Sequence, residues 1–378
     1  MRDFVLSSES MTAGHPDKLC DQISDAMVDA CLAGDPPTGC VAECAIATGI
    51  VFLSIRHGRP LGFDPAALAR RVLGEAGYGA TARQANTTVV LDSVETAELP
   101  GHTAPDAARA GHMTTAFGYA CDHTEAQMPW PIWAAHRLTR RLQAIRREDG
   151  FAWLAPDAQV QVAARFEDRR PVGVRGIAIT LHADDPCPTG AELDEAIRRA
   201  VVAPAFDGVP MQPGADTRLV VQREAGRGGP EAHAGLTGRK TGDDSYGGFC
   251  RQGSSALSGK DPSRIDRVAA YAARQAAVSV LAAGLARECE VQLSYVAGDE
   301  GPGGLEVDTF DSGRVSDAEI ERTLARALDL RVGAIVERLG LWSLPSARGG
   351  RFFRDLACYG HFGRTDLDPP WERPVHLG

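Results

Sequence analysis

PDKLCDQISDAMVDACL (residues 16–32), GCVAECAIA (39–47) and IVFLSIR (50–56) follow one another near the start of the chain. In the first stretch apolar residues recur every three or four positions, which predicts a helix with one buried face. The other two stretches predict two strands. This order predicts an α+β unit in which a helix packs against a small sheet.

The flanking sequence completes this first unit. A short strand is expected before the helix, at Phe4–Leu6. After the two strands, Asp64 and Pro65 supply an N-cap and a first-turn proline, which predicts a helix that ends near Gly77. A strand at 87–91 closes the unit.

The same order of elements recurs twice. The second unit has a helix at 132–147, strands at 160–166 and 174–182, a helix capped by Thr189 and Glu192, and a strand at 219–222. The third has a helix at 262–286, strands at 289–296 and 305–310, and a helix that runs from a cap at Ser316 and Glu319 towards Leu339. We therefore predict an α+β fold of three similar subdomains related by a pseudo-threefold repeat. Each is a small mixed sheet with helices on one face, and the subdomains span 1–100, 110–227 and 228–366. Three unrelated α+β segments are the alternative, and a dimer through the open sheet faces would suit the repeat.

Composition limits the class of function. The 378 residues are 44% hydrophobic and carry a net charge of -10, which disfavours a nucleic-acid surface. No apolar run approaches the roughly 20 residues of a membrane helix, and the first ten residues lack the apolar core of a signal peptide. The nine scattered cysteines favour reduced thiols, so we expect a cytoplasmic protein without nucleic-acid or membrane partners.

Three stretches carry candidate chemistry. GHPDK (14–18) places His15, Asp17 and Lys18 at a helix start, where partial positive charge favours phosphate. GLTGRKTG (235–242) sets Arg239 and Lys240 among glycines that allow close backbone approach. GSSALSGKD (253–261), followed by PSRID (262–266), resembles a phosphate loop but is not a Walker A loop. Taken singly, these stretches also fit a polar helix cap, a basic hairpin tip and a capped helix with a local ion pair.

Together the three stretches are more informative. They contain five basic residues (Lys18, Arg239, Lys240, Lys260 and Arg264) and three acidic ones (Asp17, Asp261 and Asp266). Interleaved cations and carboxylates in an acidic protein predict a site for a polyphosphate with a divalent metal. Asp261 and Asp266 are both candidates for the metal ligand of the third stretch.

These stretches also resemble a known family. GHPDK, GLTGRK, SGKDPS (258–263), AAYAAR (269–274) and YGHFGR (359–364) all look like S-adenosylmethionine synthetase, colinearly over about residues 3–366. The resemblance implies three α+β subdomains and an enzyme that joins the sulfur of methionine to C5′ of ATP, expels the triphosphate and hydrolyses it. It also implies Mg²⁺ and K⁺ as cofactors, and a homodimer or tetramer with sites between two subunits.

The resemblance assigns roles by position. His15 matches the histidine that stabilises charge on the departing oxygen. The remaining matches are Asp17 and Asp266 as magnesium ligands, Glu43 as a potassium ligand, Lys18, Arg239, Lys240 and Lys260 as triphosphate contacts, and Asp157, Ala158 and Ala256 as nucleotide contacts.

Several positions depart from the family pattern. Arg56 replaces a glutamate that holds the methionine ammonium, and His233 replaces an aspartate that touches both substrates. The family's methionine-contacting glutamine falls at Ala97 or Glu98. The others are His112 in a rebuilt 110–115 segment, Arg264 and Gln159 at lysine positions, and 224–227 without the aromatic residue that stacks on adenine.

The departures leave three hypotheses. The first is S-adenosylmethionine synthesis from ATP and methionine. The second keeps the leaving-group chemistry but uses another nucleophile, water or another nucleoside triphosphate, because Arg56 would repel an ammonium group. The third is a non-catalytic, nucleotide-binding paralogue, which would have no need of His15, Lys18, Lys240 and Lys260.

Overall fold

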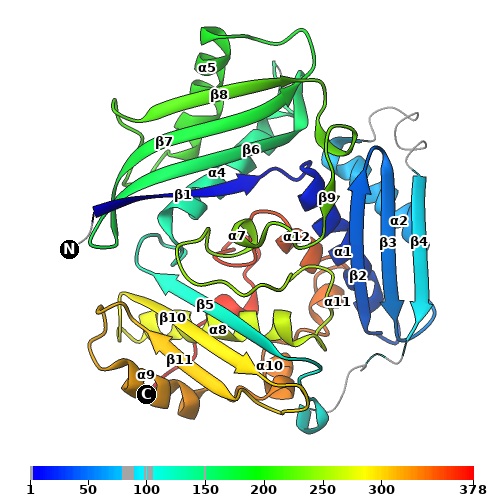
Figure 1. The fold of residues 1–378 in the computed structure, drawn as a ribbon, viewed down its shortest axis with the longest axis vertical. Helices are drawn as coiled ribbons and strands as arrows, with labels where there is room; N and C mark the ends of the chain where they lie inside the picture. Colours follow the sequence, from blue (N-terminus) through cyan, green and yellow to red (C-terminus); the bar gives the residue numbers. More distant parts are fainter. Residues whose placement is uncertain (1–2, 79–88, 98, 100–104, 149) are drawn as a thin grey trace.

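The computed structural model describes residues 3–78, 89–97, 99, 105–148 and 150–378, and these residues form three small sheets with helices packed on them (Figure 1). The first sheet has the strand order β1-β6-β7-β8. Its strands are β1 (Asp3–Met11), β6 (Leu154–Glu167), β7 (Arg170–Ala183) and β8 (Arg218–Ala225). Helix α4 (Trp130–Ile145) packs on β1 and β6.

The second sheet contains the two strands predicted at 39–47 and 50–56. Its order is β4-β3-β2-β9, with β3–β4 parallel and the other pairs antiparallel. Its strands are β2 (Cys40–Ala47), β3 (Ile50–His57), β4 (Val89–Thr96) and β9 (Gly235–Leu236). Helices α1 (Pro16–Leu32) and α2 (Pro65–Leu73) pack together, α1 against β2 and α2 beside β4.

The third sheet is antiparallel and has the order β11-β10-β5. Its strands are β5 (Thr114–Cys121), β10 (Glu288–Tyr295) and β11 (Gly304–Asp308). Helix α8 (Ile265–Ala282) crosses this sheet and is buried on nearly all sides. It therefore buries two arginines, and each has an acidic partner: Arg267 pairs with Asp25 at 2.5 Å and Arg274 with Glu372 at 2.7 Å.

The remaining elements are short. The α-helices are α5 (Ala191–Ile197), α6 (Ala203–Ala205), α7 (Thr241–Asp244), α9 (Asp317–Ala327), α10 (Val332–Arg338), α11 (Leu344–Ala347) and α12 (Phe353–Leu356). The π and 3₁₀ turns are Gly74–Tyr78, Pro105–Ala107, Arg198–Val202, Gly229–Glu231 and Pro370–Glu372. Figure 1 places α7 and α12 in the region that the three sheets surround. No helix of the described residues has the length and apolarity to cross a membrane.

Each sheet takes one strand from a distant part of the chain. Strand β1 pairs with β6, β5 pairs with β10, and β9 pairs with β2. These pairings tie the three parts of the chain together. The subdomain limits 1–100, 110–227 and 228–366 stay a prediction, because the exchanged strands cross them in every sheet.

The elements match the predicted ones in type and order, but most ends are shifted: α2 ends at Leu73, β4 runs on to Thr96 and β6 begins at Leu154, while 87–88 lie outside the described residues. Three further differences are larger. Helix α1 has the predicted bounds, but the 262–286 helix begins only at Ile265. The caps at Thr189 and Ser316 donate or accept no side-chain cap hydrogen bond, and α5 instead follows Gly190 with a φ of 56°. The predicted helix from Ser316 to Leu339 is interrupted after Ala327, because Leu328 adopts extended angles.

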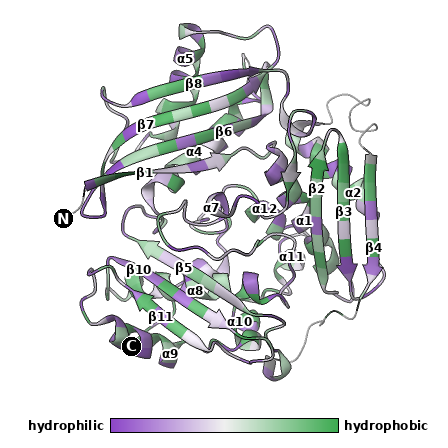
Figure 2. Ribbon diagram, viewed as in Figure 1, coloured by the Kyte–Doolittle hydropathy of each residue, from purple (hydrophilic) through white to green (hydrophobic). Residues whose placement is uncertain are grey.

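One face of the second sheet is exposed and apolar at its centre. Side chains alternate along β3, and Phe52 is 46% exposed. Its cross-strand neighbours on the same face are Ala45, which pairs in turn with Leu236, and Leu91. Leu236 and Leu91 are 48% and 50% exposed, and Figure 2 shows hydrophobic residues along β2 and β3. We call Leu236, Ala45, Phe52 and Leu91 the apolar row.

Candidate active site

The first turn of α1 is fixed by its own sequence and by close contacts. Pro16 occupies the first turn, and the Nδ1 atom of the N-cap His15 accepts a hydrogen bond from the backbone N–H of Asp17 at 3.2 Å. A Cβ on Gly14 would lie 2.4 Å from Pro156, and one on Gly235 would lie 2.2 Å from the Pro16 carbonyl carbon. Glycine at these two positions therefore lets β6 and β9 press against the helix start.

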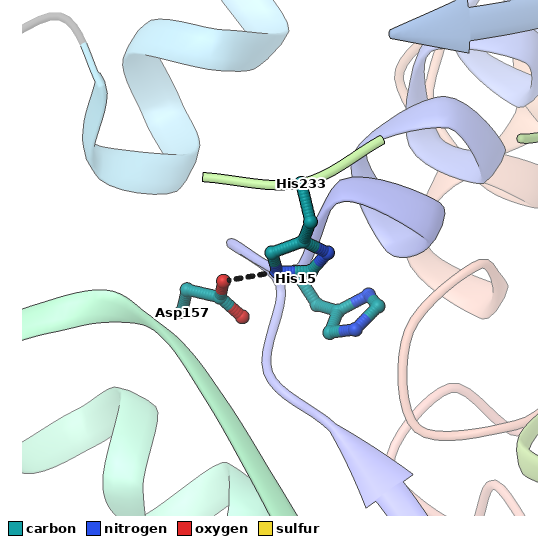
Figure 3. Close-up of side chains that lie close together, drawn as sticks. All are labelled: His15, Asp157 and His233. Carbon is teal, nitrogen blue, oxygen red and sulfur yellow. Dashed lines mark hydrogen bonds and ion pairs between the residues drawn. The ribbon is translucent and has the colours of Figure 1, made fainter. Parts of the chain in front are cut away.

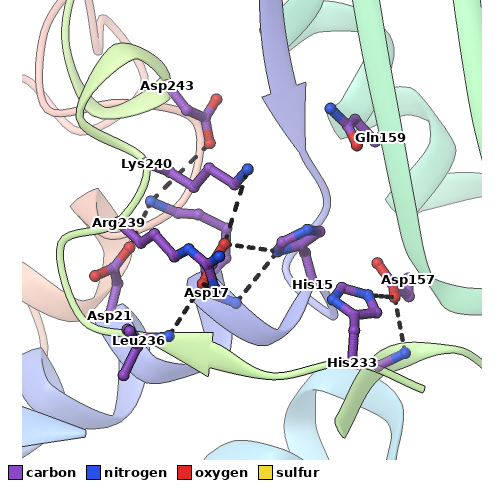
Figure 4. A network of polar contacts seen from close by, with 12 residues as sticks. His15, Asp17, Asp21, Asp157, Gln159, His233, Leu236, Arg239, Lys240 and Asp243 are labelled. Atoms are coloured by element: carbon purple, nitrogen blue, oxygen red, sulfur yellow. Dashed lines mark hydrogen bonds and ion pairs between the residues drawn. The ribbon is translucent and has the colours of Figure 1, made fainter. Parts of the chain in front are cut away.

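The basic residues of the GLTGRK stretch lie close to the Asp17 carboxylate. Its Oδ1 accepts the N–H of Leu236 at 3.0 Å, and Arg239 lies 3.9 Å from the same oxygen. The Nζ of Lys240 lies 3.8 Å from Oδ2 (Figure 4). The side chains of Arg239 and Lys240 are 55% and 28% exposed, so both cations remain accessible to an anion.

His15, Asp157 and His233 form a compact triad beside that carboxylate (Figure 3). His233 Nε2 lies 2.8 Å from Asp157 Oδ2, which also accepts the Gly229 N–H at 2.7 Å. Burial lowers the pKa of His15 to about 4, so its ring is neutral at neutral pH. The hydrogen bond to Asp157 raises the pKa of His233. Burial is the largest influence and opposes ionisation of Asp157, but the contacts with His233, His15 and the Gly229 N–H together outweigh it and lower the Asp157 pKa.

Lys18 lies apart from these residues, inside the protein. Its side chain is fully buried and donates to Asp21 at 2.9 Å and to Asp244 at 2.5 Å. Burial favours the neutral amine, but Asp21 and Asp244 outweigh it and raise the Lys18 pKa. Burial raises the pKa of Asp243 to about 6 and that of Asp244 to about 8. The contacts described for Lys18 are all internal, so its contact with triphosphate stays a prediction.

A second group of polar residues surrounds Asp266 in the first turn of α8. Asp266 Oδ2 accepts from Lys260 at 2.6 Å and lies 3.0 Å from His112 Nε2, and Oδ1 accepts from Thr114 at 2.8 Å. Burial alone would raise the pKa of Asp266, but Lys260, Thr114 and His112 together outweigh burial and lower it. This carboxylate is therefore ionised and is shared by three side chains.

A cleft of about 600 Å³ runs along the exposed face of the second sheet. Glu43, Ala256 and Lys260 line it together with all four residues of the apolar row. Arg56 is exposed on β3, where its Cα neighbours are Val41 on β2 and Glu95 on β4. The predicted potassium ligand thus lies in the same cleft as Ala256, a predicted nucleotide contact, and Lys260, a predicted triphosphate contact.

Models of one protein family match nearly the whole chain, domain by domain and in order. The N-terminal, central and C-terminal domains of S-adenosylmethionine synthetase match residues 3–97, 107–225 and 227–373. The chain is 41% identical to the S-adenosylmethionine synthase of Acaryochloris marina, over 98% of this chain and 94% of that protein. It is 43% identical to the enzyme of that name from Synechococcus sp. strain JA-3-3Ab, with 98% and 95% covered. The chain belongs to the S-adenosylmethionine synthetase family. The resemblance, the three-part α+β fold and the enzyme class, a transferase of the methionine adenosyltransferase type, are confirmed.

The structure also places the remaining predicted site residues of this synthetase family member, with the exception of Glu98. The Ala158 carbonyl accepts the Thr12 N–H and its own N–H donates to the Thr12 hydroxyl, and Arg264 is the half-buried N-cap of α8. Gln159 donates to Glu9 at 3.0 Å on the exposed side of β6. Asp261, the alternative metal ligand, is buried and accepts from Cys40 and Ser263, which suits a structural cap. Glu98 lies outside the described residues.

Sequence reasoning missed the roles of four residues. Thr114 lies in the rebuilt 110–115 segment, and its contact with Asp266 could not be seen because 152 positions separate them. His182 lies 3.6 Å from Asp157 and 3.5 Å from Glu224, inside β7. The carboxylates of Asp243 and Asp244 follow Lys240 closely in the sequence, and two adjacent acids after a basic pair were the available signal.

Proposed function

We propose that the protein is an ATP-dependent adenosyltransferase in which a sulfur nucleophile, methionine or an analogue, attacks C5′ of ATP. The sulfur lone pair forms the new S–C5′ bond while the C5′–O5′ bond breaks, and its electrons leave with the triphosphate, which is then hydrolysed. The supporting observation is that His15, Arg239 and Lys240 gather around Asp17 at the start of α1.

The chemistry of the reaction suits these residues. Displacement at a primary carbon needs a good leaving group, and triphosphate becomes one when its charge is neutralised. The half-exposed guanidinium of Arg239 and ammonium of Lys240 supply positive charge, and the N-terminus of α1 adds a favourable dipole. A neutral His15 can donate a hydrogen bond to the departing O5′ without adding a charge to the ground state.

The donor set fits the two cofactors that the family resemblance implies. Carboxylate oxygens are the ligands that Mg²⁺ prefers, and the pKa of the Asp266 carboxyl is lowered by Lys260. Asp17 and Asp266 would hold Mg²⁺, and Glu43, exposed in the cleft, would hold K⁺. When bound, the magnesium neutralises phosphate charge and leaves Arg239, Lys240 and Lys260 to orient the phosphates.

We propose further that the site is completed by a second copy of the chain in a homodimer, or a pair of dimers. The apolar row is half exposed in the isolated chain, and such a face on a small sheet gains stability when a copy covers it. Glu43, Ala256 and Lys260 line the same cleft. A dimer through this face would therefore bring Glu43 and Lys260 of one subunit close to the same sheet face of its partner.

One observation favours a rebuilt acceptor pocket. Arg56 stands on the exposed sheet face beside Glu95, at a position where the family has a glutamate for the methionine ammonium. A guanidinium there favours a carboxylate or phosphate group on the acceptor instead. The second candidate is therefore the same displacement with a non-methionine nucleophile, water, or another nucleoside triphosphate. A non-catalytic paralogue is disfavoured by the accessible cations around Asp17.

The test is an incubation of purified protein with ATP, Mg²⁺, K⁺ and methionine, followed by mass spectrometry of the products. S-adenosylmethionine with diphosphate and phosphate supports the proposal. Triphosphate release without S-adenosylmethionine supports the second candidate. Turnover of neither kind, over a panel of nucleotides and sulfur nucleophiles, would overturn both.

A further inference from the structure

The triad of His15, Asp157 and His233 has a feature that the adenosyl-transfer reaction does not use. Each residue offers one ligand atom, and the three atoms all lie within 4.8 Å of one another. Among the described residues this is the one place where three or more His, Cys, Asp or Glu ligand atoms gather so closely. The triad lies in the region where the helix start of α1, strand β6 and the GLTGRK stretch meet (Figure 3).

The composition of the triad selects a kind of metal. Two imidazoles and one carboxylate suit zinc, iron, nickel or copper, whereas magnesium and calcium prefer all-oxygen sites. Asp17 and Asp266, the proposed magnesium ligands, both have Lys or Arg close by, but the described contacts of Asp157 are with His233, His182 and a backbone N–H. A divalent ion therefore meets no ammonium or guanidinium among the contacts of Asp157, and on the His15 side it faces Lys240, whose ammonium lies 3.8 Å from the Asp17 oxygen beside the His15 ring.

The groups behind the triad suit a metal centre. Asp157 is 3% exposed, and the Gly229 N–H at 2.7 Å fixes the direction of its carboxylate. His15 is 7% exposed, and its Nδ1 accepts the Asp17 N–H at 3.2 Å; zinc at Nε2 would require the ring proton on Nδ1, where Asp17 Oδ2, 3.8 Å away, is the acceptor beside it. Such outer partners orient histidine and carboxylate ligands and raise metal affinity. His233 is the accessible member, with its side chain 41% exposed, which provides the entry path.

We propose that His15, Asp157 and His233 bind one zinc-class transition-metal ion, and that this site arises in this chain because a histidine stands at position 233. Three protein ligands leave a fourth position open, as in zinc sites that exchange a water or an outside ligand. The binding itself does not depend on the proposed function. If the proposed function is correct, the ion occupies the place of the nucleotide, because His15 and Asp157 are then nucleotide contacts, and zinc inhibits the enzyme.

The experiment titrates untagged protein with Zn²⁺ in the absence of nucleotide, by calorimetry and by competition with a chromophoric chelator. We expect one ion per chain. His233→Ala and Asp157→Asn should each weaken zinc binding at least roughly tenfold. His112→Ala is the matched control, because His112 is 36% exposed and also contacts an aspartate, at 3.0 Å, and this change should leave zinc affinity within about twofold. Equal zinc affinity in native protein and His233→Ala would overturn the proposal.

Two further arms keep the result interpretable. Co²⁺ replaces Zn²⁺ as a coloured probe, and thiolate charge-transfer bands in its spectrum would assign the ion to a cysteine and so contradict the proposal. ATP is then added while a metal buffer holds free zinc constant. Competition supports both the zinc site and the nucleotide position. If zinc binding is lost in His233→Ala but ATP does not compete, the zinc site stands and the proposed nucleotide position fails.

Discussion

The two acidic centres of the site hold their cations in different ways. At Asp17 the basic side chains lie beyond hydrogen-bond distance of the carboxylate. Lys240 is 3.8 Å and Arg239 is 3.9 Å away, and both are partly exposed. At Asp266 the ammonium of Lys260 is in direct contact at 2.6 Å, and His112 and Thr114 share the same carboxylate. The first centre is ready to receive an anion, whereas the second is satisfied internally. A metal or phosphate that binds at Asp266 must displace Lys260, so the two centres should respond differently to substitution.

The largest effect is expected at the open centre, from Lys240→Ala. This change removes a cation that is free to stabilise the departing triphosphate, and loss of one such group typically lowers kcat by about 10²–10³. Steady-state kinetics of triphosphate release measures it. Arg331→Ala is the control, because Arg331 is an exposed basic residue that pairs with Asp329 on the surface. A Lys240→Ala enzyme with native kcat would place the triphosphate elsewhere.

The next effect concerns the satisfied centre, through Asp266→Asn. Asparagine keeps the hydrogen bond with Thr114 but removes the charge that Lys260 and a metal share. We expect kcat to fall by about 10², with a higher Mg²⁺ concentration needed for half-maximal rate. The magnesium dependence of the rate distinguishes this from a folding defect, and Asp329→Asn on the surface serves as control. An unchanged magnesium requirement would mean that Asp266 is only the partner of Lys260.

The sequence predicted the open centre better than the satisfied one. His15, Asp17, Arg239 and Lys240 belong to two short motifs, and β9 carries the second motif directly onto the first. The bounds of α1 followed from Pro16 and from its apolar stripe. A two-residue strand such as β9 has no periodicity to detect, so the exchange of strands between sheets was invisible.

The contacts between distant segments that neutralise buried charged side chains could not be predicted from the sequence either. A lysine in a polar motif is expected to be exposed, yet Lys18 is buried because Asp21, Asp243 and Asp244 meet it from two segments of the chain. The contact of Thr114 with Asp266 likewise depends on β5 pairing with β10 and lying against α8. In both cases a local pattern gave the residue type, and the tertiary fold decided its partner.

A smaller effect is expected from Arg56→Glu, which tests the acceptor side. If the acceptor carries an anionic group at this place, the change should weaken the native reaction by about tenfold and improve the use of methionine. The ratio of kcat/KM for methionine to that for the native acceptor measures the change. Arg59→Glu makes the same change of charge three residues further on, at another exposed position, and is the control. Unchanged kinetics in Arg56→Glu would show that residue 56 lies outside the pocket.

The smallest predicted effect concerns how stability depends on pH. His15 and His233, which both lie beside Asp157, should contribute to this dependence with opposite signs. Burial lowers the pKa of His15 from 6.5 to about 4, so the unfolded chain binds more protons between those values and the protein loses stability as pH falls through that range. The hydrogen bond with Asp157 raises the pKa of His233, so its contribution to stability is present below pH 6.5 and is lost as pH rises through the higher, folded value.

His15→Asn keeps a side chain that can cap α1, and it should reduce the loss of stability between pH 7 and pH 5 by about 1–2 kcal/mol. His233→Asn should act in the opposite direction, by making that loss larger. Denaturation midpoints at the two pH values, together with NMR titration of both rings, measure these changes in stability. If both variants changed the pH-dependent loss of stability in the same direction, the assignment would be contradicted. That assignment is a buried, neutral His15 and an accessible His233 bound to Asp157.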